Sequence, residues 1–134
     1  MTAQVKEPFV FTLALRARAG AVVLARDLVT MAFEQWGLER LDYNGRLIMS
    51  ELTTNAVRAC EEDAEITVRV WRADGGDPVL EVSDPSPLLP VYGNADLEAE
   101  RGRGLFIVNL LAKDLIVLRR TGTEKTVRAV MDAT

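Results

Sequence analysis

The 134-residue sequence contains no histidine and a single cysteine, Cys60. The absence of histidine excludes a histidine-containing catalytic triad, a histidine-ligated zinc site and a phosphohistidine formed on the chain itself. One cysteine cannot form an internal disulfide, and without histidine beside it a transition-metal site is not expected. Cys60 ends an apolar helical run, so we interpret it as a small core residue. Any chemistry of this chain must therefore use carboxylates, hydroxyls, amides and the backbone.

The sequence also has no run of about eighteen apolar residues, no signal peptide and no cluster of lysine and arginine. Its formal net charge is -4. These features predict a soluble, cytoplasmic protein whose partners are neither nucleic acid nor a membrane. The apolar and charged fractions, 49% and 27%, are those of an ordinary globular protein, and the length suits one domain over residues 1–134.

Apolar residues recur at helical spacing in three segments. The first predicted helix follows Gly20 and ends near residues 36–37, and its apolar positions are Val23, Leu24, Leu28, Met31 and Ala32. The second carries Ile48, Leu52, Ala56 and Ala59 at helical spacing, and Asp42 is its candidate N-cap. The third, residues 105–112, is apolar nearly all round, which predicts a helix buried under the sheet.

Alternating apolar residues predict strands between these helices. One strand is expected over residues 9–16, a hairpin from residues 65–71 and 78–83, and a second hairpin from residues 116–118 and 126–131. We therefore expect an α+β fold, a two-layer sandwich in which a mostly antiparallel sheet of about five strands carries three helices on one face.

Two segments are expected to lie outside these elements. Residues 1–7 are polar and are predicted to form a disordered tail. Residues 88–101 begin apolar and become acidic, and a loop of this length is uncommon in a compact domain. Long loops often carry function, so this segment is a candidate functional loop.

Glu51 and Asn55 are the first candidate site residues. They are four residues apart, so both side chains project from one face of the second predicted helix. Beside a buried stripe, this carboxylate and amide could flank a metal ion or a reacting hydroxyl. The same pair is also typical of the solvated edge of an amphipathic helix.

A second candidate is the glycine-rich segment at residues 101–104, which is followed directly by the third predicted helix. Glycines let the backbone approach a ligand, and the N–H groups of a first helical turn favour anions. Arg101 and Arg103 add charge suited to a phosphate chain. A lone Gly-x-Gly is also common as a simple turn. Asp84, before a proline at a strand end, is likewise either a turn residue or a carboxylate held beside a ligand.

Taken in order, these segments resemble the nucleotide-binding domain of the GHKL ATPase superfamily, the Bergerat fold. Residues 51–56 (Glu-Leu-Thr-Thr-Asn-Ala) resemble its N box, and residues 84–87 (Asp-Pro-Ser-Pro) a degenerate first glycine box. Residues 101–108 (Arg-Gly-Arg-Gly-Leu-Phe-Ile-Val) resemble the second glycine box. The sequence is most similar to the stand-alone anti-sigma-factor serine/threonine kinases, especially the short actinobacterial ones, over residues 9–131.

The resemblance implies ATP and Mg²⁺ as cofactors and gives roles to three residues. Asn55 would coordinate Mg²⁺. Glu51 would be the general base that takes the proton from an attacking serine or threonine hydroxyl. Asp84 would accept a hydrogen bond from the adenine amino group. Such phosphoryl transfer depends mainly on positioning and charge neutralisation, so it does not require histidine.

The second glycine box would hold the phosphates. The residues implied there are Arg101, Gly102, Arg103, Gly104 and Leu105, with residues 85–101 as an ATP lid. Thr126 matches a family threonine that lies near the adenine, and Lys125 is an additional candidate.

The sequence departs from the family pattern at three places. Prolines and a serine replace the glycines of the first box, as is frequent in short actinobacterial members. The histidine that often follows the N box is absent from residues 57–60. Glu124 stands where a glycine is common, which puts a carboxylate near the expected nucleotide.

The leading functional hypothesis is an ATP-binding anti-sigma factor with protein serine/threonine kinase activity. Its implied partners are a sigma factor, a STAS-type antagonist that it phosphorylates, and a second copy of itself bound through the first strand and helix. The alternative is a regulatory module that acts by protein contacts, with or without nucleotide. A third hypothesis is a detached histidine-kinase catalytic domain that phosphorylates a histidine on another chain.

Overall fold

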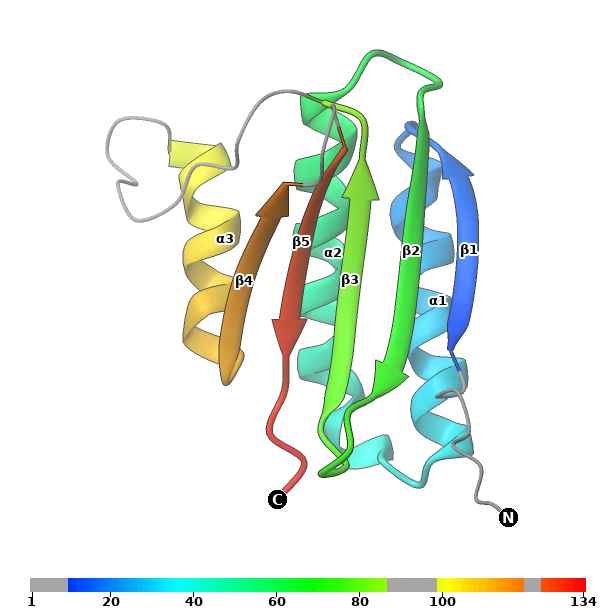
Figure 1. Ribbon diagram of the computed structural model, residues 1–134, viewed down its shortest axis with the longest axis vertical. Coiled ribbons are helices and arrows are strands. Elements are labelled where there is room, and N and C mark those ends of the chain that lie inside the picture. The colour runs from blue at the N-terminus through cyan, green and yellow to red at the C-terminus, as the bar shows by residue number, and fades with distance from the viewer. Residues whose placement is uncertain (1–9, 87–98, 120–123) are drawn as a thin grey trace.

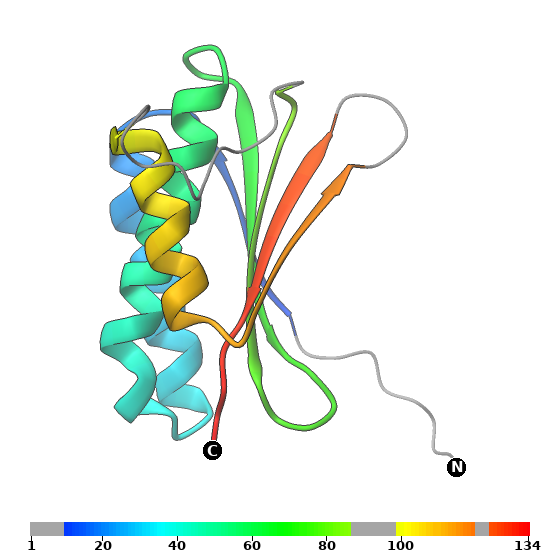
Figure 2. The same ribbon diagram turned by 90° about the vertical axis from the view of Figure 1, so that its left-hand side faces the viewer.

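The computed structural model describes residues 10–86, 99–119 and 124–134. Within these residues an open five-stranded antiparallel sheet carries three α-helices on one face, and none of the described helices covers its other face (Figures 1 and 2). The predicted α+β sandwich is confirmed. The expected tail at residues 1–7 and residues 87–98 of the expected lid lie outside the described residues.

The elements follow one another in the order β1 (Phe11–Arg16), α1 (Gly20–Gln35), a 3-10 turn (Glu39–Leu41), α2 (Asp42–Ala59), β2 (Glu65–Arg72), β3 (Pro78–Asp84), α3 (Ala99–Leu111), β4 (Asp114–Arg119) and β5 (Lys125–Val130). The strand order in the sheet is β1-β2-β3-β5-β4, and every neighbouring pair is antiparallel. Strand β3 is therefore central, and β1 and β4 form the two edges.

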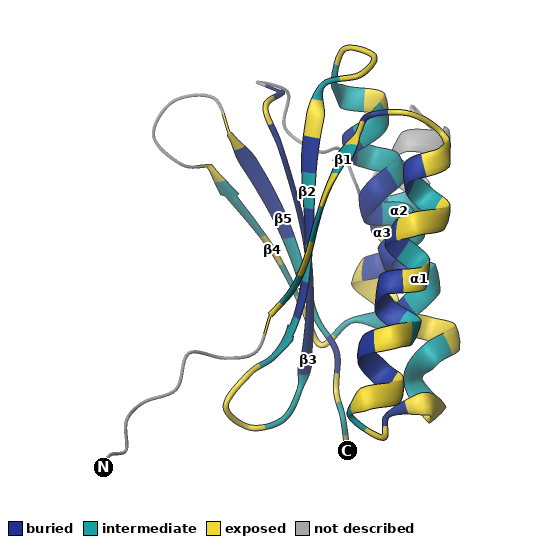
Figure 3. Ribbon diagram, turned by 90° about the vertical axis from the view of Figure 1, so that its right-hand side faces the viewer, coloured by how far each residue is buried: buried dark blue, intermediate teal, exposed yellow. Residues whose placement is uncertain are grey.

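The core lies between the sheet and the helices (Figure 3). Alternate residues of β2 point toward the helices and are buried, namely Ile66, Val68 and Val70. This alternation is the period of two that the sequence predicted. Among the described residues, no helix is long and apolar enough to cross a membrane.

Helix α1 corrects one sequence expectation. Its buried stripe consists of Ala21, Ala25, Leu28, Val29, Ala32 and Phe33. Val23, Leu24 and Met31, expected on the apolar face, are instead 51%, 50% and 47% exposed. One stripe of a helix can face the sheet and α2, and here the small alanines occupy it because they allow a close approach.

Helix α3 differs from the prediction in two ways. It begins at Ala99 rather than at residue 105, so the paired glycines lie within its first turns. Alanine, glutamate and arginine at residues 99–101 favour the helix, and this preference outweighs the cost of the glycines. The helix is also not buried all round, since Leu105 and Val108 are buried while Phe106 and Leu110 are exposed. It packs beside α2 as a surface helix.

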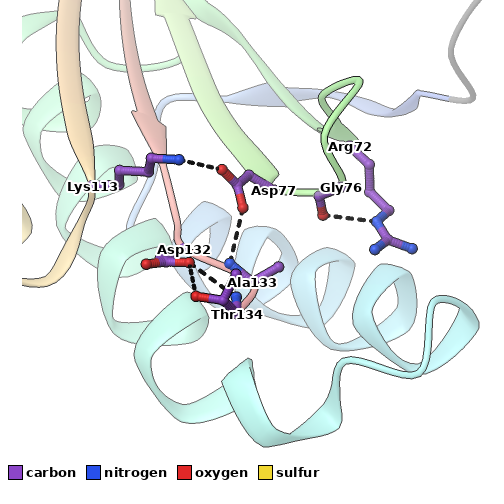
Figure 4. Close-up of polar contacts among 7 residues, drawn as sticks. All are labelled: Arg72, Gly76, Asp77, Lys113, Asp132, Ala133 and Thr134. Carbon is purple, nitrogen blue, oxygen red and sulfur yellow. Dashed lines mark hydrogen bonds and ion pairs between the residues drawn. The ribbon is translucent and has the colours of Figure 1, made fainter.

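One end of the sheet is fastened by polar contacts around Asp77 (Figure 4). Lys113 Nζ donates to Asp77 Oδ2 at 2.8 Å, and the Ala133 backbone N–H donates to Asp77 Oδ1 at 3.0 Å. Beside them the Arg72 side chain donates to the Gly76 carbonyl at 3.0 Å. These contacts join the β2–β3 turn, the start of β4 and the C-terminal residues. The opposite end of β3 carries Asp84.

Candidate functional site

Helices α2 and α3 bring Glu51 and Gly104 into contact. A Cβ atom placed on Gly104 would lie 2.5 Å from Glu51 Oε1, closer than any real side chain tolerates. The half-buried Glu51 carboxylate therefore lies directly against the backbone of α3. Two segments that are far apart in the sequence, and that were singled out separately, meet here.

Asn55 lies one turn after Glu51 on α2 and is half-buried like it. Leu52 and Ala56, on the adjacent face, belong to the hydrophobic core. The predicted pair thus lies where the core meets solvent. Thr53 is fully buried, and its Oγ1 has no hydrogen-bond partner among the described residues.

Asp84 ends β3, is 2% exposed and receives donors from two directions. The Ser86 backbone N–H donates to Asp84 Oδ1 at 2.8 Å, the hydrogen bond of an Asx turn. Lys125, directly opposite in the β3–β5 register, places its Nζ 3.4 Å from Asp84 Oδ2. The Lys125 side chain is 0% exposed, so this is a buried ion pair.

Cys60 is a third neighbour of Asp84. Burial, the charge of Asp84 and a hydrogen bond to it together raise the pKa of the Cys60 thiol to about 11, against the smaller opposing effects of Lys125 and the Ser86 backbone. The group is therefore a thiol at neutral pH. Sequence reasoning identified Cys60 as a core residue and missed this contact, because its distance from Asp84 depends on how α2 packs on β3.

Thr126 lies apart from this cluster. Its Oγ1 is 2.8 Å from Ser83 Oγ, and in the β3–β5 register these two residues oppose each other next to the Asp84–Lys125 pair. Neighbouring residues of a strand point to opposite faces. Thr126 and Ser83 therefore face the side of the sheet away from the helices, and Lys125 rather than Thr126 shares the side of Asp84.

The remaining candidates fall into two groups. Leu105 is fully buried in the core, and Glu124 is exposed. The side chains of Arg101 and Arg103 and residues 87–98 of the expected lid lie outside the described residues.

A separate cavity of about 550 Å³ opens on the outer side of α1 and α2. It contains none of the predicted site residues, and its lining residues are Arg26, Glu39, Asp42, Tyr43, Arg46, Leu47 and Ser50. Its two arginines are matched by two acidic side chains, which does not suit a polyphosphate. We therefore do not include it in the candidate site.

The sequence model of the family described as the histidine kinase-like ATPase domain matches residues 15–131. This match covers most of the chain, and the protein therefore belongs to the histidine kinase-like ATPase domain family. No curated protein sequence matches the chain.

The fold is similar to a solved structure described as "The crystal structure of SiaB-SiaC complex from Pseudomonas aeruginosa". The TM-score is 0.68, and the sequences are 14% identical over 90% of this chain and 88% of that chain. At this identity the likeness establishes the shared fold.

Family membership implies ATP binding, and the described residues can be tested against that ligand. An ionised carboxylate offers about four acceptor positions. Among the described residues, the Ser86 N–H and Lys125 Nζ take two of these positions at Asp84, so the carboxylate keeps acceptor positions that suit a donor such as the amino group of adenine. The close packing of Glu51 on α3 brings a carboxylate to the segment that resembles a phosphate-binding box. The described residues therefore fit an adenine nucleotide.

Proposed function

We propose that this protein is an ATP-binding anti-sigma factor that phosphorylates a serine or threonine of a STAS-type antagonist protein. The observation that carries the proposal is the contact of Glu51 with Gly104. It sets a carboxylate that could act as a base against the helix whose first turns resemble the second glycine box. Membership in an ATPase domain family supports the nucleotide, and the shared fold with a chain of a two-protein complex is in keeping with a partner-switching regulator.

In this proposal the residues of α2 act on the transferred phosphoryl group. Glu51 accepts the proton of the attacking hydroxyl, and Asn55 holds Mg²⁺. The ion would neutralise charge on the phosphates. Among the described residues no group of three or more acidic or cysteine side chains could hold a metal ion. That agrees with Mg²⁺, which usually takes one or two protein ligands and completes its shell with phosphates and water.

Asp84 and the start of α3 would hold the two ends of the nucleotide. Asp84 accepts a hydrogen bond from the adenine amino group. The N–H groups of the first turn of α3, together with Arg101 and Arg103, bind the phosphates.

Calorimetric titration with ATP and Mg²⁺ tests nucleotide binding. We expect the wild type to bind, Asp84→Ala to lose binding, and Asn55→Ala to lose the dependence on Mg²⁺. Glu34→Gln, an exposed glutamate on α1, is the matched control for substitutions of charged residues. Absence of binding by the wild type would contradict the proposal.

Transfer of phosphate to the cognate antagonist tests the kinase activity. Glu51→Gln should reduce this transfer by about a hundredfold or more, the usual contribution of a general base, while ATP affinity stays unchanged. Unchanged transfer by Glu51→Gln would rule out its role as the base.

A regulatory module without kinase activity is the second candidate. Two departures from the family pattern favour it, namely the prolines and serine in place of the glycines of the first box and Glu124 in place of a glycine. This candidate predicts normal binding of the partner in the complete absence of nucleotide.

The proposal includes a homodimer formed through β1 and α1. Strand β1 is an edge of the sheet, and α1 exposes the three apolar side chains Val23, Leu24 and Met31. Edge strands and exposed apolar side chains are common sites of chain association.

A further inference from the structure

We propose that Lys125 is a positioning residue that fixes the Asp84 carboxylate as a selective acceptor for a base carrying an amino group. The inference rests on the proposed ATP-binding function. It assigns to Lys125 an effect on which nucleotide is chosen, exerted through Asp84.

The geometry places Lys125 behind Asp84. The two residues are direct cross-strand partners at the adjoining ends of β3 and β5. Lys125 Nζ lies 3.4 Å from Asp84 Oδ2, and their side chains are 0% and 1% exposed. A lysine without exposed surface acts on a ligand through the group it contacts.

The ion pair presents Asp84 as an acceptor. Lys125 Nζ lies on Oδ2, and both side chains are buried, so the pair is held away from solvent. A carboxylate in such a pair only accepts hydrogen bonds, and it repels a carbonyl oxygen. Lys125 therefore holds Asp84 in the arrangement that distinguishes a 6-amino purine from a 6-oxo purine.

A second contact fixes the orientation of the carboxylate. The Ser86 N–H donates to Oδ1 at 2.8 Å. With Lys125 on Oδ2, donors from two segments hold the group in place. Such preorganisation favours one direction of approach for the remaining donor.

The test compares the affinities of ATP, purine riboside triphosphate, which lacks the 6-amino group, and inosine triphosphate, which has a 6-oxo group. We expect the wild type to prefer ATP by at least about tenfold, as for a hydrogen bond to a charged group. Lys125→Met should lower this preference to about the level of Asp84→Asn. If Lys125→Met only made the protein less stable, the binding of all three ligands would weaken equally.

Lys113→Met is the matched control. Lys113 also pairs with an aspartate, at 2.8 Å, but it is exposed and lies at the other end of β3. This variant should keep the full preference for ATP. A folded Lys125→Met protein that also keeps the wild-type preference would overturn the inference.

The double variant Asp84→Asn/Lys125→Met decides the question if Lys125→Met does not fold. It leaves no unpaired charge in the interior, so it should fold where the single variant fails. If Lys125 acts through Asp84, the double variant and Asp84→Asn have equal preferences. A further loss in the double variant would show direct contact with the base and contradict the positioning role. If the wild type binds no ATP, the proposed function and this inference are both wrong. If it binds ATP but Asp84→Asn keeps the full preference, this inference alone is wrong.

Discussion

Glu51 occupies the space that a side chain at position 104 would need. The distance from its Oε1 to the Cβ position of residue 104 is 2.5 Å, so any side chain at position 104 would displace the end of Glu51. The glycine thus leaves space for a carboxylate of another helix and does not form a turn in its own chain.

Substitution of Gly104 by alanine should therefore separate activity from stability. The new methyl group displaces the flexible end of Glu51, which can rotate away, and alanine favours the helix by about 1 kcal/mol. We expect a melting temperature within a few degrees of wild type and a loss of phosphate transfer similar to that of Glu51→Gln. Gly20→Ala, at the start of α1 with no atoms near the new methyl, is the control and should remain active. Full activity of Gly104→Ala would show that the position of Glu51 does not matter.

The contact of α1 with α2 depends on a second glycine. A Cβ on Gly45 would lie 2.7 Å from Cε2 of Phe33, whose ring is completely buried. A buried ring cannot move aside as the end of a glutamate can, so Gly45→Ala should destabilise the protein by about 1–3 kcal/mol. Urea unfolding measures this change. Phe33→Leu combined with Gly45→Ala should restore part of the lost free energy of unfolding. If the destabilising effects of the two substitutions simply add, the clash between them is contradicted.

The Cys60 thiol should react slowly and with an unusual pH dependence. Its pKa is raised to about 11 by burial and by Asp84, so the reactive thiolate is scarce at pH 8 in the folded protein. Because Cys60 is the chain's one cysteine, a thiol reagent reports on it alone. The rate of reaction with the reagent should rise until about pH 11 in the folded protein. In the denatured protein the rate should level off near pH 9.0, the ordinary pKa of the thiol. A folded-state midpoint near 9 would disprove the contact with Asp84.

The same shift implies a loss of stability at high pH. The folded state holds the thiol proton more tightly than the unfolded state does. The stabilisation is fully present below pH 9 and is lost as the pH rises from 9.0 to about 11. Cys60→Ala should remove this part of the pH dependence, which urea unfolding at pH 8 and pH 11 would measure.

The proposed dimer should respond to a charge on α1. Leu24 is 50% exposed, so Leu24→Asp can be made without disturbing the core. We expect the variant to sediment as a monomer at concentrations where the wild type is a dimer. Its melting temperature should remain that of the wild-type monomer. Asp27→Asn is the control. It also changes the charge of α1, but it leaves the exposed apolar side chains of the helix as they are. Equal sedimentation of wild type and Leu24→Asp would exclude this face.

Much of the fold was predictable because its signals are local. The alternation in β2 and the helical spacing in α2 each reflect one buried face, and both elements form, although Asp42 is the first residue of α2 and not its N-cap. The start of α3 was missed because glycines suggest a helix boundary, whereas Gly104 is needed inside a helix to admit Glu51. The exposure of Leu24 was missed because several stripes of α1 are apolar, and tertiary packing decides which one is buried.

The candidate site was predictable where its residues lie on one element. Glu51 and Asn55 share a face of α2 because they are four residues apart, and that spacing is visible in the sequence. The pairing of Asp84 with Lys125 requires the register of β3 on β5, which no local pattern contains. The contact of Cys60 with Asp84 likewise depends on the packing of α2 against the sheet.

The Asp84–Lys125 pair also has a consequence for chain length. The chain leaves the central strand β3 at Asp84 and comes back beside it at Lys125 in β5, with α3 and β4 in between, so the buried pair joins the two ends of this segment. The entropy of closing a flexible loop grows only with the logarithm of its length, about 0.6 kcal/mol for each doubling. A change in the length of the expected lid should therefore change the free energy of unfolding very little. The lid could then vary in length while the Asp84–Lys125 pair and the strands that carry it stay the same.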